Sequence, residues 1–397
     1  MPFKSGTTIE PMPHAPVYLD YHATTPVDRR VVEAMLPYFT ECFGNPASSM
    51  HQWGWKAQEA VEQARREVAT LIGATPREIV FTSGATESNN LAIQGLAADP
   101  PAGKRHVIVS AIEHKSVLEA AHRLESAGWR VTELPVSRDG LVDPASLDRA
   151  LTGDTALVSV MAANNEIGVI QPLAAIGAAA HARGALLHVD AAQGAGKIPI
   201  DVQAMHIDLL SLTGHKMYGP KGCGALFVRK RTELAPLIIG GGQERGLRSG
   251  TLNVPGIVGL GAACAICQRE VAEESVRLGR LRDRLLDGLR SQLDGVVVNG
   301  SLERRLPNNL HVSFAGVDGE SLLIGIGDIA VSSGSACSSA SATPSHVLRA
   351  ILGDNVPPAA IRFGLGRFTT EDEIDYAIEK FTTVVRHLRG VAPAARS

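Results

Sequence analysis

The sequence has no excess of charge of either sign, no apolar run long enough to cross a bilayer, and no framework of cysteines. Its 397 residues include 38 Lys and Arg against 41 Asp and Glu, which gives a net charge of −3. A nucleic-acid-binding domain normally carries a clustered basic patch, and this sequence has none. A membrane-spanning helix needs roughly 20 consecutive apolar residues. We therefore expect neither nucleic acid nor a membrane as a partner.

The sequence contains five cysteines, and an odd number in so long a chain argues against paired disulfides. Cys264 and Cys267 form a CxxC motif, but no second pair follows, and a zinc site of this kind needs four ligands. We expect these two residues to be buried in a helix, and we expect no bound metal. The N-terminal stretch lacks the apolar segment of a signal peptide, and free thiols suit a reducing compartment. The expected location is the cytoplasm.

From about residue 77, short apolar runs alternate with helical stretches, without internal repeats. This pattern predicts a mainly parallel sheet with helices on both faces. A long amphipathic helix is expected over about residues 269–293, because apolar residues recur there at helical spacing. The segments that follow resemble the strands and helices of a smaller α+β unit. We expect a large domain over residues 25–265 and a small domain over 1–24 and 266–397.

Polar and reactive side chains follow five of the predicted strands. They are Ser83 and Thr86 in the turn TSGATE, then His114, Asn165, Asp190 with Gln193, and His215 with Lys216. In open α/β sheets, ligands bind at the carboxyl ends of the strands. We therefore expect these residues to form one site.

The types of side chain in this expected site suit pyridoxal phosphate. Lys216 can form a Schiff base with an aldehyde, and Asp190 can keep a pyridine nitrogen protonated. A turn of small residues before a helix offers backbone N–H groups and the positive helix end to a phosphate. The sequence therefore predicts pyridoxal 5′-phosphate as cofactor.

Longer motifs carry a family resemblance. They are YLDYHATTPVD, FGNPAS, REIVFTSGATESNNLAI, NNEIGV, HVDAAQ, SLTGHKMYGPKG, GGGQERGLRSGT, SSGSACSSAS and IRFGLGRFT. In their order and spacing, from about Val17 to Arg389, they resemble the cysteine desulfurases of the class V aminotransferase fold. The resemblance implies an α/β fold with a large cofactor-binding domain around a mainly parallel, seven-stranded type of sheet. It also implies a smaller α+β domain with a mobile loop that carries Cys337.

The resemblance also implies a reaction. A cysteine desulfurase removes sulfur from L-cysteine, releases L-alanine and holds the sulfur as a persulfide, here on Cys337. A sulfur-acceptor protein, such as an iron–sulfur scaffold, then receives the sulfur for clusters, other cofactors or tRNA. Cys337 is expected to share a cluster transiently with such a scaffold. The small residues around Cys337 give a permissive backbone, which suits a loop that carries sulfur outward.

The resemblance assigns roles to individual residues. Lys216 forms the Schiff base and removes the α-proton, Asp190 holds the pyridine nitrogen, and His114 lies over the ring. The expected binding residues are Gln193 and Asn165 for the ring, Ala85, Thr86, Thr213, Gly214 and His215 for the phosphate, and Arg362 together with Asn165 for the substrate. Thr251 is expected to reach the phosphate site of the partner subunit in a homodimer.

Three alternatives stay open at the level of the sequence. A selenocysteine lyase and an ordinary class V aminotransferase would share the fold, although an aminotransferase would not need Cys337. A non-catalytic sulfur carrier or scaffold would not need Lys216, Asp190 and His114, which are all present. His22 stands where many relatives have Ser. Relatives that dock an iron–sulfur scaffold often have a longer C-terminal extension, so the acceptor is left open.

Overall fold

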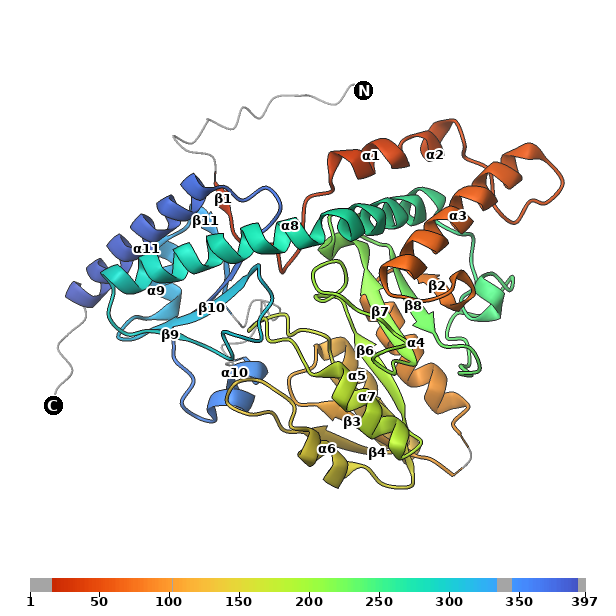
Figure 1. Ribbon diagram of the computed structural model, residues 1–397, viewed down its shortest axis with the longest axis horizontal. Coiled ribbons are helices and arrows are strands. Elements are labelled where there is room, and N and C mark those ends of the chain that lie inside the picture. The colour runs from red at the N-terminus through yellow and green to blue at the C-terminus, as the bar shows by residue number, and fades with distance from the viewer. Residues whose placement is uncertain (1–15, 102, 334–344, 392–397) are drawn as a thin grey trace, which may run out of the picture.

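A seven-stranded sheet forms the centre of the larger lobe (Figure 1). The structure is a computed structural model that describes residues 16–101, 103–333 and 345–391. Across the sheet, the strands are β2 (Ile79–Thr82), β8 (Gly224–Val228), β7 (Leu209–Thr213), β6 (Leu186–Asp190), β5 (Thr155–Ser159), β3 (His106–Ser110) and β4 (Arg130–Leu134). Only β8 runs antiparallel to its neighbours, so the predicted mainly parallel sheet is confirmed.

Helices cover both faces of this sheet, as the sequence predicts. Ile79 and Phe81 of β2 pack into one buried cluster, whereas Val80 between them packs into another on the opposite face. This alternation follows from the two-residue period of a strand. The helices against the first face are α3 (Gln52–Leu71), α6 (Pro144–Ala150), α7 (Leu173–Ala182) and the first part of α8 (Val254–Gln292), and those against the second are α4 (Ala85–Ala98) and α5 (Lys115–His122).

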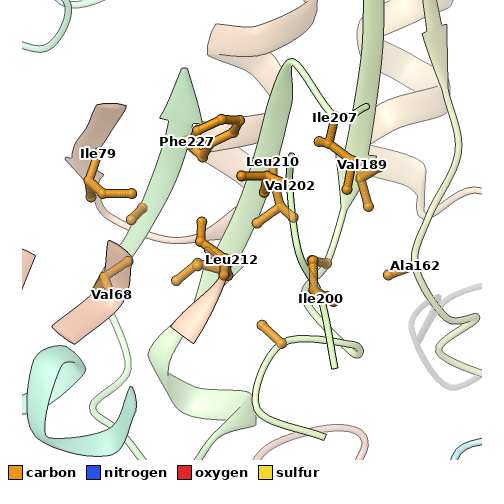
Figure 2. Close-up of a cluster of buried hydrophobic side chains, with 14 of the residues drawn as sticks. Val68, Ile79, Ala162, Val189, Ile200, Val202, Ile207, Leu210, Leu212 and Phe227 are labelled. Atoms are coloured by element: carbon orange, nitrogen blue, oxygen red, sulfur yellow. The ribbon is translucent and has the colours of Figure 1, made fainter. Parts of the chain in front are cut away.

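Figure 2 shows part of the cluster on the first face, where Val68 of α3 and Phe227 of β8 are among the labelled side chains. Leu210 and Leu212 of β7 belong to the same cluster and are fully buried. Burying a side chain of this size contributes about 1.5–3 kcal/mol. This packing fixes β7, and the residues that follow β7 line the site described below.

Helix α8 (Val254–Gln292) begins well before the helix predicted over residues 269–293. The segment before Arg269 contains several glycines, which are poor helix formers. These glycines serve close packing: a Cβ on Gly261 would lie 2.6 Å from Cα of Ala64 on α3. A Cβ on Gly259 would lie 2.5 Å from Sδ of Met35, at the end of α1 (Arg29–Met35). Tertiary contact therefore overrides local propensity here.

The long helix α8 runs from the larger lobe into the smaller one (Figure 1). Its second half, including Leu281 and Leu285, packs into a separate buried cluster with Phe363 and Phe381. Val17 and Leu19, from the start of the described chain, join the same cluster. The predicted division into domains at residues 24/25 and 265/266 stays a prediction.

An antiparallel sheet of four strands forms the smaller lobe. In order, its strands are β12 (Ser332–Ser333), β13 (Ala360–Gly364), β10 (Asn309–Phe314) and β9 (Val296–Val298). A short parallel pair joins β1 (Val17–Tyr18) to β11 (Ile329–Ala330). The remaining α-helices are α2 (Pro37–Thr40), α9 (Gly319–Gly325), α10 (His346–Leu352) and α11 (Glu371–Val391). Among the described residues, no helix is both long and apolar enough to span a membrane.

Candidate active site

A cavity of about 580 Å³ lies at the carboxyl ends of β2, β6 and β7. The predicted site residues that line it are Ala85, Thr86, His114, Asn165, Asp190, Gln193, Thr213, His215, Lys216 and Arg362. Strands β6 and β7 are parallel neighbours, with Asp190 opposite Ser211, so their ends lie at the same edge of the sheet. The prediction that strand ends bring these residues together is therefore confirmed, while their individual roles stay predictions. Cys337 lies outside the described residues.

Lys216 ends a short 3₁₀ helix that directly follows β7 (Gly214–Lys216). Its Nζ donates a hydrogen bond to the backbone carbonyl of Ala23 at 2.6 Å and another to that of His22. Both carbonyls belong to the YLDYHATTP segment near the N-terminus. The amine is therefore held between the end of a central strand and a segment far away in the sequence.

Asp190 is the last residue of β6, and its side chain is buried. Its Oδ2 accepts a hydrogen bond from Nδ2 of Asn89 at 2.8 Å, and its Oδ1 accepts one from the backbone N–H of Ala192 at 2.9 Å. These two donors fix the orientation of the carboxyl group in the wall of the cavity. Such a group suits pairing with a protonated ring nitrogen.

His114 caps the N-terminus of α5, and this capping interaction settles its tautomer. Its Nδ1 accepts a hydrogen bond from the backbone N–H of Ser116 at 3.2 Å. Burial lowers the pKa of His114, and the nearby carboxylate of Asp190 opposes that effect. The neutral imidazole therefore carries its proton on Nε2. In this tautomer Nε2 is a hydrogen-bond donor, and the basic lone pair of the ring is on Nδ1.

The N-terminus of α4 forms a cradle for an anion. Gly84 precedes the helix with φ of +151°, a conformation that L side chains rarely adopt, and no side chain caps the helix. The first backbone N–H groups of a helix have no partner within it, and the helix end is positive. Ala85 and Thr86 begin this helix and line the cavity. The arrangement suits a phosphate group.

Thr213 lies beside this cradle, since a Cβ on Gly84 would lie 3.6 Å from its Oγ1, and His215 lines the same cavity. Nδ1 of His215 lies 3.1 Å from Oγ1 of Thr24. Burial, followed by the charge of Lys216, lowers the pKa of His215 to about 4, so its imidazole is neutral at pH 7. Oγ1 of Thr213 donates to the carbonyl of Cys223 at 3.4 Å. Both side chains are neutral hydrogen-bonding groups, which suits phosphate binding beside the helix end.

Arg362 reaches the cavity from β13 of the smaller lobe. Its guanidinium group donates to the carbonyl of Asn165 at 2.8 Å, to Oδ1 of Asp20 at 2.8 Å and to Oγ of Ser332 at 3.0 Å. Its Nε is buried and has no hydrogen-bond partner within the part of the chain that the structure describes. A buried donor without a partner is costly. Arg362 is therefore suited to bind an anion such as a carboxylate.

Two predicted residues do not line the cavity. Gly214 is buried, and a Cβ on it would lie 2.9 Å from the carbonyl oxygen of Pro220. The glycine therefore allows the two backbone segments to pass close to each other. Thr251 is exposed and lies outside the cavity. Its expected contribution to the phosphate site of a partner subunit stays a prediction.

The residues of the cavity fit pyridoxal phosphate. The uncapped start of α4 suits the phosphate, Lys216 supplies an amine for the aldehyde, and Asp190 supplies a fixed carboxyl group for the ring nitrogen. The cavity also has room for a molecule of this size, since ligand sites typically measure roughly 300–1,000 Å³.

Several residues of the site have no role predicted from the sequence. Asn89 lies on the fifth position of α4 and orients Asp190, and Lys197 bonds the side chain of Gln193. Nδ1 of His22 lies 3.0 Å from Oε1 of the same glutamine side chain. The spacing from Gln193 to Lys197 offers a weak signal, because both follow β6 within eight residues. Nothing in the sequence around Asn89 distinguishes this residue from one that is exposed to solvent.

No metal site is seen among the residues that the structure describes, because nowhere do three or more His, Cys, Asp or Glu gather as ligands. Cys264 and Cys267 are buried within α8 without a disulfide, as the sequence predicts. Burial raises the pKa of Cys267 to about 11 and that of Cys264 further. Both thiols therefore stay protonated at pH 7, and a protonated buried thiol is inert.

Comparisons with known proteins agree with this geometry. The family model described as aminotransferase class-V matches residues 17–377. A protein named cysteine desulfurase IscS from Anaeromyxobacter sp. (strain K) is 57% identical over 95% of this chain and 94% of its own length. A solved structure described as a NifS-like protein superposes with a TM-score of 0.88, at 41% identity, over 94% of this chain and all of the other.

A second solved structure, described as SspA in complex with cysteine, has a TM-score of 0.78 and is 40% identical. It covers 89% of this chain and all of its own. The matched regions include the carboxyl ends of the central strands and the small lobe that supplies Arg362. The chain belongs to the class V aminotransferase family, whose members depend on pyridoxal phosphate.

Proposed function

We propose that this protein is a pyridoxal-phosphate-dependent cysteine desulfurase. The observation that carries the proposal is the single cavity that holds Lys216, Asp190 and His114 beside an uncapped helix N-terminus. Relatives that share more than half of their aligned residues with this chain are named cysteine desulfurase. One similar solved structure is described as a complex with cysteine. The substrate is L-cysteine, and the products are L-alanine and sulfur bound to the enzyme.

The bound cofactor supplies an electron sink for the α-carbon of the amino acid. Lys216 would hold the cofactor by its amine, and the fixed carboxyl group of Asp190 would keep its ring nitrogen protonated. The free amine of Lys216 would take the proton from the α-carbon. His114 would offer its Nε2–H as a hydrogen-bond donor during proton transfer, because its Nδ1 accepts from the backbone N–H of Ser116. These steps are general acid–base catalysis by positioned groups.

Arg362 binds the carboxylate of the substrate. Its buried Nε supports this assignment, since the described residues offer that atom no partner. Asp20 already pairs with the guanidinium group at 2.8 Å, so the substrate carboxylate competes with or adds to this ion pair. The planar fork of donors suits a bidentate carboxylate better than a lysine would. Asn165 also lines the cavity, and its backbone carbonyl accepts a hydrogen bond from Arg362 at 2.8 Å.

Cys337 is the acceptor of the sulfur atom. Its thiolate attacks the sulfur of the substrate, the carbon–sulfur bond breaks, and the electron pair passes to the carbon skeleton. The balance is L-cysteine plus the thiol of Cys337 giving L-alanine plus a persulfide on Cys337, so no other oxidant or reductant is needed. Splitting the transfer in two through a covalent intermediate is nucleophilic catalysis. An acceptor protein, such as an iron–sulfur scaffold, then takes the outer sulfur.

The proposal includes a homodimer in which Thr251 contributes to the partner's phosphate site. Thr251 is exposed and does not line its own cavity, which supports a role across an interface. Large apolar side chains are also exposed between the end of α1 and the first turn of α3; they are Leu36, Phe39, Phe43, Met50, Trp53 and Trp55. The rings of Phe43 and Trp53 stack at 5.1 Å between centroids, and exposed apolar side chains that gather in this way suit a contact with another protein. The proposed compartment is the cytoplasm, where Cys337 stays reduced.

The purified protein with pyridoxal phosphate and L-cysteine tests the proposal. Alanine and sulfide should form in equal amounts in the presence of a thiol. Lys216→Ala should lose the visible absorbance of the bound cofactor and all turnover, whereas the exposed Lys230→Ala should keep both. Borohydride reduction and peptide mapping that place the cofactor on another lysine would contradict the assignment. Selenide from selenocysteine alone, or amino transfer to a keto acid, would favour one of the alternative enzymes.

A further inference from the structure

Lys197 is a second lysine beside the candidate active site. It follows β6 by seven residues, and its Nζ lies 2.9 Å from Oε1 of Gln193. Lys197 and Lys216 both line a second, small cavity next to the first. None of the predicted roles involves Lys197, although its ammonium group contacts one of the expected cofactor-binding side chains.

The contact with Lys197 determines the orientation of the carboxamide of Gln193. Nζ of Lys197 donates a hydrogen bond to Oε1 of Gln193 at 2.9 Å, which places the oxygen of the amide on the side of the lysine. The amide nitrogen then faces the other way, where Nε2 donates to the carbonyl of His22 at 2.9 Å. Without Lys197, the amide could rotate by half a turn and exchange its donor and acceptor.

The orientation of Gln193 in turn determines the tautomer of His22. Nδ1 of His22 lies 3.0 Å from the same Oε1, which can only accept, so Nδ1 carries the proton. Burial lowers the pKa of His22 well below its ordinary value, and the charge of Lys197 adds to the effect. The ring is therefore neutral, with its lone pair on Nε2.

The same network reaches the catalytic amine. The carbonyl of His22 accepts a hydrogen bond from Gln193 and another from Nζ of Lys216. Both interactions meet at one oxygen atom, so a change at Gln193 affects the environment of Lys216. Lys197 thus acts on the cofactor site in two ways, through the side chain of Gln193 and through its own charge.

We propose that Lys197 is a positioning residue of the reaction, which fixes the orientation of Gln193 in the wall of the cavity and favours the neutral amine of Lys216. This inference rests on the proposed function and extends it by one residue. A cation close to a lysine disfavours the protonated form of that lysine. The reaction needs the neutral form of Lys216, because only a free lone pair can bond the aldehyde or take a proton.

Several charged or titratable groups influence Lys197 from the surrounding elements. They are Lys216 after β7, Cys267 and Glu274 on α8, and Arg362 on β13. Burial first, and then the charges of Lys216 and Arg362, lower the pKa of Lys197 to about 7, although Cys267 and Glu274 act in the opposite direction. The mutual effect of the two lysines agrees with the geometric argument.

The test compares the holoenzyme of the parent with Lys197→Met and Lys197→Arg. The readouts are the cofactor dissociation constant and the visible absorbance of the bound cofactor as a function of pH, which reports protonation at the nitrogen of Lys216. In Lys197→Met, the pH midpoint of the absorbance change should move upward by about one unit, because the neighbouring positive charge is gone. Cofactor affinity should fall about tenfold, because the carboxamide of Gln193 in the cavity wall is no longer held in one orientation. Lys197→Arg should keep the parent's midpoint.

A double-mutant cycle with Gln193→Leu separates positioning from general damage. If Lys197 acts through Gln193, the double variant should lose no more cofactor affinity than Gln193→Leu alone. If Lys197→Met fails to fold, Lys197→Gln replaces it. The pH midpoint of the cofactor absorbance should again move upward. A folded Lys197→Met holoenzyme with the parent's midpoint and affinity overturns this inference and leaves the proposed function intact. A parent that binds no pyridoxal phosphate overturns both.

Discussion

The carboxamide of Asn89 donates a hydrogen bond to the carboxyl group of Asp190, with 2.8 Å between Nδ2 and Oδ2. The two residues lie 101 positions apart, on α4 and β6. Asn89 is completely buried, and its Nδ2 also donates to Oγ of Ser116. The helix whose first turn suits the phosphate therefore also orients the group expected at the other end of the cofactor.

This relationship predicts the effect of Asn89→Ala. Asp190 would keep the backbone N–H of Ala192 but lose its side-chain donor, so its carboxyl group would be less well oriented. Cofactor affinity should fall by about three- to tenfold, which corresponds to the loss of one hydrogen bond to a charged group. Equilibrium binding of pyridoxal phosphate, followed by absorbance, measures the change. The matched control is Asn90→Ala on the same helix, since Asn90 bonds only within α4 and should leave affinity unchanged.

A buried carboxyl group next to the site gives the protein a pH-dependent stability. Burial raises the pKa of Glu113 to about 8, and hydrogen bonds from Ser110 and the backbone of Met161 offset this only in part. The folded state therefore binds a proton that the unfolded state has lost above about pH 4.5. Stability from this group is present below pH 4.5 and is lost as pH rises through 8.

Glu113→Gln should remove that pH dependence. Gln keeps an acceptor for both donors and cannot ionise. Relative to the parent, the variant should gain on the order of 1–3 kcal/mol in unfolding free energy at pH 9 and little at pH 5. Urea unfolding at the two pH values measures the difference. A gain of the same size at both pH values would show that ionisation of Glu113 is not the cause.

The sequence predicts those parts of the site that follow from the geometry of parallel strands. Asp190 and Lys216 come directly after buried apolar runs, and parallel neighbours end at one edge, so their proximity needs no further information. Asn89 and Lys197 could not be found this way. Each acts through a contact on the inner side of a helix or loop, and which side faces inward depends on packing across the whole fold.

The N-terminal extension of α8 escaped prediction for a related reason. Local propensity penalises the glycines of this segment, whereas the structure uses two of them to bring α8 close to α3 and α1. Propensity acts within a few residues, but the contact with Ala64 spans almost two hundred positions. The amphipathic half after Arg269 was predictable because its apolar stripe repeats locally, although Val276 in that pattern is exposed.

Two glycines on α8 should respond to alanine in opposite directions. A Cβ at Gly261 would lie 2.6 Å from backbone of α3, so Gly261→Ala should lower the unfolding free energy by about 1–3 kcal/mol. A Cβ at Gly279 would meet nothing within 4 Å, so Gly279→Ala should raise it by about 0.5–1 kcal/mol through helix propensity. Chemical denaturation of both variants measures this. Equal effects of the two substitutions would mean that the close approach of α8 and α3 does not matter.

Cys337 is the residue on which sulfur transfer depends in the proposed function, and it lies outside the described residues. Cys337→Ala should still bind pyridoxal phosphate and still change its absorbance with L-cysteine, because Lys216, Asp190 and His114 remain in the cavity. Alanine and sulfide should nearly vanish, since nothing attacks the substrate sulfur. Radiolabelled sulfur from cysteine should bind the parent and the control Cys42→Ala in a form that thiols remove, and should be absent from Cys337→Ala. If Cys337→Ala makes alanine at the parent's rate, another group is the nucleophile.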